Sequence, residues 1–228
     1  MRELYNQRLN AFNHNQRALA DLAHDLMSQA TEALLTSNLE LAESIVARAD
    51  EVDELKDHGE QAAFAMLALE APVARDLRHV VSGIHIVGSF ARMALLGIHV
   101  AKVARRRHPQ CAVPDELRPR IQEMSSLGCH AALMVTSIME DADPQKALAL
   151  EGDDDQVDRI HHELFNLATA KDWPYSAREA VDVTQLSRMF ERYSDHAVSV
   201  GNRVIFMATA MQPEEFAQSV AHPKRPEM

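Results

Sequence analysis

Glycine is scarce in this chain, which has only seven among its 228 residues. That is about half or less of the share of roughly 7% found in average proteins. Alanine, leucine, methionine, glutamate and arginine are abundant instead, and these residues favour helices over strands. The composition therefore predicts an all-α protein.

Cysteine and net positive charge are also lacking. The two cysteines, Cys111 and Cys129, have neither the spacing of a metal site nor that of a disulfide framework. The formal net charge is −11, which makes nucleic acid an unexpected general partner. No glycine-rich phosphate loop, nucleophile elbow or Cys-His arrangement is present, so we do not expect an enzyme.

No uninterrupted apolar run is long enough to suggest a targeting or membrane segment. The N-terminal residues 1–8 are mostly polar and do not form a signal peptide. The most apolar region, residues 80–104, is broken by four charged or polar positions, His85, Arg92, His99 and Lys102. A buried central helix fits this region better than a membrane span, and we expect a cytoplasmic protein.

What the chain does contain is an internal duplication. Asp50-Glu51-Val52-Asp53 returns 105 residues later as Asp155-Gln156-Val157-Asp158. Further along, Phe90-Ala91-Arg92 aligns with Phe190-Glu191-Arg192 at an offset of 100 residues. Two tandem units of about a hundred residues each are therefore visible in the sequence.

Proline positions and apolar periodicity divide each unit into three helices. Pro72, Pro144 and Pro174 precede long helix-like runs, and Asp143 is an N-cap with proline at the next position. We predict two similar three-helix bundles packed together, over residues 1–109 and 110–211, with a disordered tail over 212–228. The six expected helices span residues 3–36, 39–70, 73–107, 116–141, 144–171 and 175–210.

Two pairs of carboxylates in the second unit are the main candidates for chemistry. Asp154 and Asp158 lie four residues apart on the fifth expected helix, and Glu191 and Asp195 lie four apart on the sixth. Residues with this spacing share one helix face, and the antiparallel arrangement brings both pairs to the same height. Four such carboxylates could hold Mg, Mn, Ca or iron through oxygen ligands, or they could form an ordinary solvated face.

Weaker candidates surround this quartet. Asp155 lies beside Asp154, and His161 or His196 could add a nitrogen ligand, which would widen the choice of metal to zinc. In the first unit only Asp50 and Asp53 remain as acidic counterparts. The positions equivalent to Asp154, Glu191 and Asp195 are Ala49, Ala91 and Leu95. We therefore expect any metal site in the first unit to be lost or weakened.

Three consecutive arginines, Arg105, Arg106 and Arg107, end the third expected helix. They could complement the negative end of the helix dipole. They could also form a docking patch for an acidic partner.

The segment Phe190-Glu191-Arg192-Tyr193-Ser194-Asp195-His196-Ala197 resembles the Glu-Arg-x-x-Asp-His-Ala motif of the PhoU family of phosphate-signalling regulators. The acidic segment 154–158 and the stretch Pro72-Val73-Ala74-Arg75-Asp76-Leu77-Arg78 are similar to two further motifs of that family. The resemblance extends over about residues 1–210.

The resemblance implies two three-helix bundles, carboxylate motifs that bind iron or other metals, and often a homodimer. It also implies a cytoplasmic negative regulator of phosphate uptake and of the phosphate-starvation response. Such a regulator contacts the ATPase of the phosphate ABC importer and a sensor histidine kinase, and reaches the membrane only through these partners. The motif carries over at Asp154, Asp158, Glu191 and Asp195. A helical metalloprotein, either a metal buffer or a carboxylate-metal enzyme, is the alternative.

Overall fold

The computed structural model describes residues 2–222, apart from the side chains of Arg2, Glu151 and Asp153. These residues form α-helices and one short 3-10 helix, with no strand among them, which confirms the all-α prediction. The helices are α1 (Arg2–Leu35), α2 (Leu39–Val46), α3 (Ala49–Glu70), α4 (Ala74–Arg107), η1 (Asp115–Leu117), α5 (Arg118–Asp141), α6 (Pro144–Ala168), α7 (Ala177–Thr209) and α8 (Pro213–Ala221).

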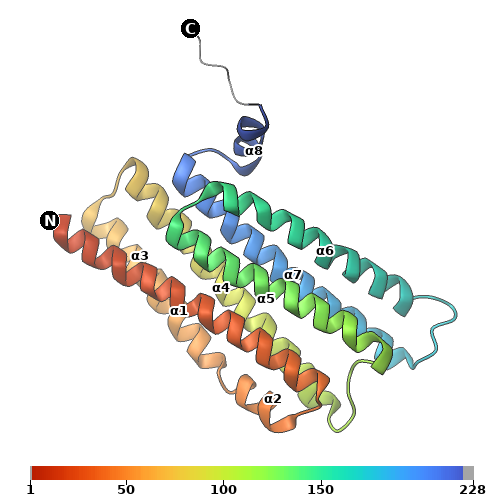
Figure 1. Ribbon diagram of the computed structural model, residues 1–228. Coiled ribbons are helices and arrows are strands. Elements are labelled where there is room, and N and C mark those ends of the chain that lie inside the picture. Colours follow the sequence, from red (N-terminus) through yellow and green to blue (C-terminus); the bar gives the residue numbers. More distant parts are fainter. Residues whose placement is uncertain (1, 223–228) are drawn as a thin grey trace.

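The long helices form two bundles that lie side by side (Figure 1). Helices α1, α3 and α4 pack together in the first repeat, with the short α2 against α1 and α4. Helices α5, α6 and α7 form the second repeat. The two repeats contact each other mainly through α4 against α7 and α1 against α5, so the prediction of two packed three-helix bundles is confirmed.

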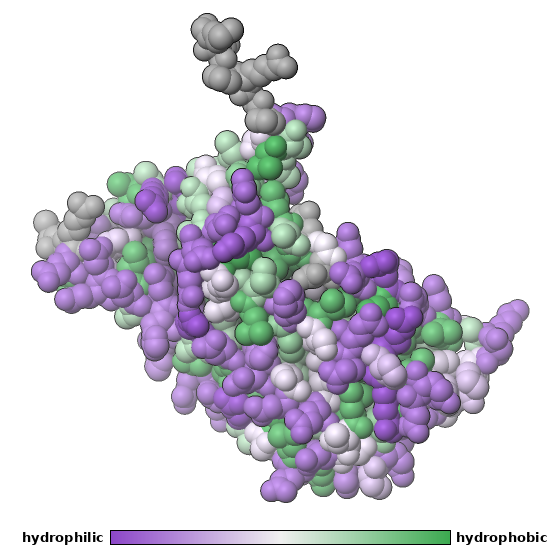
Figure 2. Space-filling model, in the orientation of Figure 1, coloured by the Kyte–Doolittle hydropathy of each residue, from purple (hydrophilic) through white to green (hydrophobic). Residues whose placement is uncertain are grey.

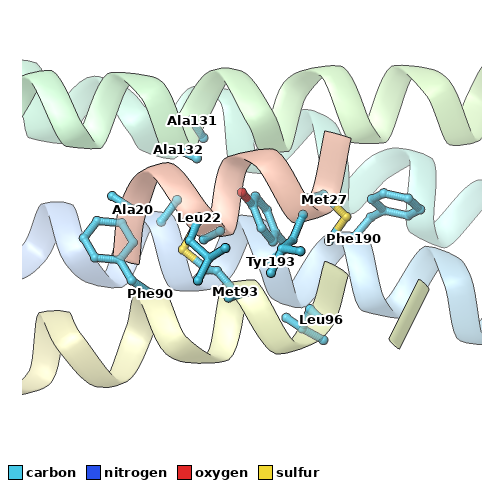
Figure 3. Packing of buried hydrophobic residues seen from close by; sticks show 14 of the residues in the cluster. Ala20, Leu22, Met27, Phe90, Met93, Leu96, Ala131, Ala132, Phe190 and Tyr193 are labelled. Carbon is cyan, nitrogen blue, oxygen red and sulfur yellow. The ribbon is translucent and has the colours of Figure 1, made fainter. Parts of the chain in front are cut away.

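One hydrophobic core runs through both repeats (Figure 3). Phe90 on α4 and Phe190 on α7, which occupy equivalent positions of the duplication, are 0% and 1% exposed. Tyr193 is fully buried, and an alanine side chain at Gly128 on α5 would contact its ring at 3.1 Å. Because the same cluster contains residues of α1, α4, α5 and α7, the repeats are joined by apolar packing.

Two details of the predicted helices are wrong. The second expected helix is interrupted between Val46 and Ala49, which separates α2 from α3. The 212–228 segment, expected to be disordered, contains α8, while its last six residues lie outside the described part of the chain. Helix α8 begins with Pro213 in the first turn, and the Glu215 side chain accepts a hydrogen bond from the backbone N–H of Gln212 at 3.3 Å, as in a capping box.

Helix α4 is the only helix among residues 2–222 that is long and apolar enough to cross a membrane. Most of its apolar stretch is buried inside the protein, which confirms the expectation of a buried central helix. Hydrophilic residues cover most of the molecular face shown in Figure 2, and hydrophobic residues appear between them in patches.

Two glycines of α4 give a matched test of this packing. A side chain at Gly97 would place its Cβ 2.9 Å from the backbone C of Leu26 and N of Met27, whereas a Cβ at Gly88 meets nothing within 4 Å. Backbone atoms cannot move aside cheaply, so Gly97→Ala should lower the free energy of unfolding by about 2 kcal/mol. Gly88→Ala should instead raise it by about 0.5–1 kcal/mol, because alanine loses less entropy in a helix. Urea denaturation of both variants measures the difference, and equal stability would contradict the close approach of α1 and α4.

Candidate functional site

Helices α6 and α7 position the acidic quartet because each begins at a well-defined cap. The Asp143 side chain accepts hydrogen bonds from the backbone N–H groups of Gln145 at 2.9 Å and Lys146 at 3.3 Å, as its sequence position predicts. Helix α7 begins with a capping box formed by Ser176 and Glu179. The two helices then pack against each other along their length.

The structure brings the four predicted carboxylates near one another. Glu191 is 8% exposed, and Asp154 and Asp158 are half-buried. Burial raises the pKa of Glu191, and the charges of Asp195, Asp158 and Asp154 raise it further, while Arg188 opposes this. Burial is also the main cause of the raised pKa of Asp154; the Ser194 hydroxyl opposes this shift, and the charges of Asp195 and Asp158 add to the increase.

Asp195 is more exposed than the other three carboxylates, and its pKa is raised by partial burial and then by the charge of Asp158. Arg188, His196 and Arg192 lower it. The carboxylates of the quartet therefore repel one another, and a bound cation would reduce this repulsion.

Two carboxylate oxygens of the quartet lack hydrogen-bond partners. Asp154 Oδ1 and Glu191 Oε2 are buried and find no partner within the described part of the chain. The other oxygen of Glu191, Oε1, forms an ion pair with Arg188. Among the described side chains, however, no group of three or more His, Cys, Asp or Glu is gathered closely enough to hold a metal ion. The donor set suits a hard cation, but its side chains would have to rotate to converge on one.

His161 is oriented in a way that suits a metal ligand. Its Nδ1 lies 2.9 Å from Ser187 Oγ, and the Ser187 hydroxyl donates to the backbone oxygen of Thr184 at 3.1 Å. In the tautomer that keeps this hydroxyl bond, Nδ1 of His161 is the donor to Oγ. Its Nε2 then carries the free lone pair, which is the arrangement typical of histidines that bind metals.

The other weaker candidates are less enclosed. Asp155 is exposed, and His196 is half-buried, with a pKa lowered by burial and by the charges of Arg192 and Arg92. In the first repeat Asp50 and Asp53 are both exposed on α3.

The first repeat replaces the acidic seam by apolar packing. Ala91 is 2% exposed, and Ala49 and Leu95 are partly buried against the core. The loss of acidic residues from the first repeat, seen in the sequence, therefore corresponds to an apolar helix face in the first repeat and an acidic one in the second.

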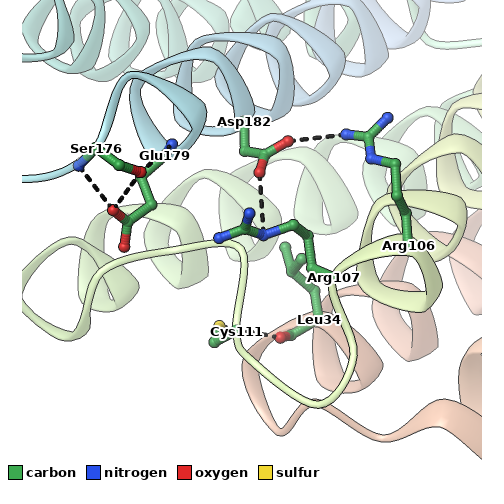
Figure 4. A network of polar contacts seen from close by, with 7 residues as sticks. All are labelled: Leu34, Arg106, Arg107, Cys111, Ser176, Glu179 and Asp182. Atoms are coloured by element: carbon green, nitrogen blue, oxygen red, sulfur yellow. Dashed lines mark hydrogen bonds and ion pairs between the residues drawn. The ribbon is translucent and has the colours of Figure 1, made fainter.

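The three arginines at the end of α4 do not form a single free patch (Figure 4). Arg106 Nη2 donates a hydrogen bond to Asp182 Oδ1 at 2.8 Å, and Arg107 Nε lies 3.2 Å from Asp182 Oδ2. Asp182 is 3% exposed and belongs to α7, so the two arginines tie the C-terminal end of α4 to the second repeat. Arg105 is exposed and has no ion pair among the described residues. Docking of a partner at these arginines stays a prediction. Arg105 is the one of the three that is exposed and not paired with Asp182, so it is the main candidate for such a contact.

Asp182 was not identified from the sequence, although a signal for it exists. It lies four residues before Leu186 and eight before Phe190, both buried, so it falls on the apolar stripe of α7. A carboxylate at a core position predicts a buried cationic partner.

The raised pKa values of the quartet predict an unusual pH dependence. The ordinary values are 3.8 for aspartate and 4.5 for glutamate, and in the folded protein Asp154, Glu191 and Asp195 all bind their protons at higher pH. Acidification from pH 7 toward these ordinary values should therefore raise the free energy of unfolding of the metal-free protein, because the folded quartet takes up protons before the unfolded chain does. The Asp154→Asn/Glu191→Gln variant should lack most of this gain in free energy of unfolding. Parallel stability profiles for the two proteins between pH 7 and about pH 5 would show that the quartet is not strained.

Comparison with known proteins gives the same two-repeat division. The model of the PhoU domain matches residues 17–104 and 121–204. The phosphate-specific transport system accessory protein PhoU homolog 2 of Mycobacterium tuberculosis is 40% identical over 213 residues, which cover 93% of this chain and 100% of that protein. PhoU homolog 1 of Mycobacterium leprae is 39% identical over 215 residues, covering 94% and 97%.

Solved structures of more distant proteins have the same fold. The phosphate transport system regulatory protein PhoU from Streptococcus pneumoniae superposes with a TM-score of 0.82 at 20% identity, covering 91% of this chain and 98% of that one. PhoU from Pseudomonas aeruginosa gives a TM-score of 0.81, also at 20% identity, over 91% and 100%. With both repeats matched and relatives of this similarity over nearly the whole length, the chain belongs to the PhoU family of phosphate-specific transport system accessory proteins.

Proposed function

We propose that this protein is a cytoplasmic negative regulator of phosphate uptake and of the phosphate-starvation response. It would act by contact with the ATPase of the phosphate ABC importer and with a sensor histidine kinase, and not by catalysis. The observation that carries this proposal is the match of both repeats to relatives named as accessory proteins of phosphate-specific transport.

We further propose that Asp154, Asp158, Glu191 and Asp195 hold one or more metal ions, with Nε2 of His161 or the side chains of Asp155 and His196 as additional ligands. The buried oxygens of Asp154 and Glu191 without partners support this, as does the charge repulsion within the quartet. Manganese, magnesium, zinc and iron are all compatible with a carboxylate-rich set. A bound cation would neutralise the quartet and hold α6 against α7, so the metal is proposed to be structural.

Two features of assembly belong to this proposal. Arg105 is the exposed cation at the end of α4 that an acidic surface of a partner could contact. A homodimer is the expected form, and sedimentation analysis of the purified protein measures it directly.

The regulatory role is tested in cells that lack the protein. Phosphate-responsive promoters should then stay active when phosphate is plentiful, and the wild-type chain should silence them again. Co-purification with the importer ATPase and the histidine kinase tests the contacts themselves. Unchanged transcription in the deletion strain would overturn the proposal.

The acidic quartet also supports a second candidate, a helical metalloprotein that stores metal or uses it for catalysis. The Glu191→Gln/Asp195→Asn variant separates the two. Loss of metal with unchanged control of transcription would favour the metalloprotein, whereas loss of both would favour a regulator whose fold depends on the metal.

A further inference from the structure

A cleft outside the acidic quartet lies between the two repeats. Its volume is about 400 Å³, and its walls come from α1 and α4 of the first repeat and from α5 and α7 of the second. Clefts of this size hold small molecules, and they occur preferentially where two units of a protein meet. A ligand there would contact both repeats at once.

The most unusual residue in the cleft is Gln16. It lies on the apolar stripe of α1, between the fully buried Phe12 and Leu19, and is itself 2% exposed. Its Nε2 has no hydrogen-bond partner among the described residues. A Cβ at Gly83 of α4 would come within 2.6 Å of this nitrogen, so the missing side chain at that position makes room for the amide. This nitrogen faces Gly83 in the packing of α1 against α4, while Gln16 also lines the cleft, so a rotation of its side chain would turn the amide toward a bound ligand. A buried amide without a partner is costly, which favours that rotation when a ligand is present.

Other walls of the cleft favour a flat ring with a polar edge. Nε2 of His79 donates a hydrogen bond to Oδ1 of Asn13 at 3.2 Å. This bond uses neither Nδ1 of His79 nor Nδ2 of Asn13, so both atoms can bond to a ligand. Met139 and Met207 supply apolar surface from α5 and α7. Thioether sulfur packs favourably against aromatic rings, and amide side chains match the adjacent donors and acceptors of a nucleobase edge.

A charged group completes the cleft. Arg17 forms an ion pair with Glu140, which joins α1 to α5, and its Nε lies 3.8 Å from Asp21 Oδ2. The side chains of Arg17 and Glu140 are 48% and 54% exposed, so this pair is weak and can be displaced. A phosphate group offers arginine a bidentate partner of higher charge than a carboxylate.

We propose that this cleft binds a small nucleotide, with the base contacting Gln16 and the methionines and the phosphate held by Arg17. Binding displaces Glu140 from Arg17 and so replaces a direct contact between the repeats by a contact through the ligand. This inference goes beyond the proposed regulatory function, because it concerns binding by the purified protein and requires neither the importer nor the kinase.

Calorimetric titration of the purified full chain tests the proposal. The probes are the four common nucleoside monophosphates, adenosine, ribose 5-phosphate and inorganic phosphate. At least one nucleotide should bind with one-to-one stoichiometry and a Kd below about 1 mM, about tenfold or more tighter than ribose 5-phosphate or phosphate. Gln16→Leu and Arg17→Gln should each weaken binding about tenfold or more, whereas Arg105→Gln, an exposed arginine outside the cleft, should change nothing.

Two variants separate ligand binding from folding. Glu140→Gln should tighten nucleotide binding, because it removes the competitor for Arg17. Gln16→Leu should raise the melting temperature of the free protein, because it removes the unpaired buried amide, and it should reduce the further rise that the nucleotide produces. Three results would overturn the proposal: no saturable binding of any nucleotide, equal binding of phosphate alone, or nucleotide binding that the cleft variants leave unchanged.

Discussion

Replacing Asp182 with alanine should lower the free energy of unfolding by about 3 kcal/mol, near the lower limit for breaking a buried ion pair. Asp182 is 3% exposed and contacts both Arg106 and Arg107. The side chain of Arg107 is only 10% exposed, so its charge would lose its buried partner and could not reach water easily. Arg106 is half-exposed and can be solvated, which keeps the expected loss below the upper limit. Chemical denaturation of the variant measures the effect.

An exposed aspartate gives the matched control. Asp141 pairs with Lys146 at 2.7 Å, a distance close to that of the Arg106 contact, but both side chains of this pair are about half-exposed. Asp141→Ala removes the same charge and should cost only about 0.5 kcal/mol. Equal losses for Asp182→Ala and Asp141→Ala would mean that burial of the Asp182 contact does not matter.

Metal binding at the quartet should raise the free energy of unfolding by about 2.7 kcal/mol when free metal is at about a hundredfold excess over its Kd. The physical reason is that the cation neutralises the quartet, in which burial and neighbouring carboxylates raise the pKa values of Asp154, Glu191 and Asp195. Because the ligands lie on α6 and α7, the gain should be concentrated in the second repeat. Hydrogen exchange with and without a chelator measures where protection is lost.

The first repeat supplies the control for this prediction. Asp50→Asn/Asp53→Asn removes two exposed carboxylates of α3 and should leave the metal-dependent gain intact. Asp158→Asn/Glu191→Gln should abolish it. A chelator that weakens protection equally in both repeats would contradict a site confined to the second.

Much of the fold could be predicted from the sequence because its signals are local or repeated. Asp143 and Pro144 define the start of α6, and the aligned Phe90 and Phe190 mark equivalent core positions. The break between α2 and α3 could not be predicted, since the interrupting residues Ala47 and Arg48 include neither glycine nor proline. Helix α8 could have been found, because Gln212, Pro213 and Glu215 form a recognisable start.

The candidate site was predicted in its residues but not in its geometry. Helical spacing is enough to place Glu191 and Asp195 on one face of α7, opposite the pair on α6. Arg188 and Glu191 are three residues apart on α7, so their ion pair could have been predicted from the spacing. Side-chain rotamers are not encoded in spacing, so the failure of the quartet to gather around one point appeared only in the structure. The same holds for the ion pair of Arg107 with Asp182, which are 75 positions apart in the sequence.

Metal content is the most direct test that the second repeat alone has kept a carboxylate site. The measurement is elemental analysis by mass spectrometry of the wild-type protein, Asp158→Asn/Glu191→Gln and Asp50→Asn/Asp53→Asn, each loaded with metal and desalted. We expect bound metal in the wild type and in the first-repeat variant, and none in the second-repeat variant. Metal-free wild-type protein, or equal metal in all three, would contradict the account.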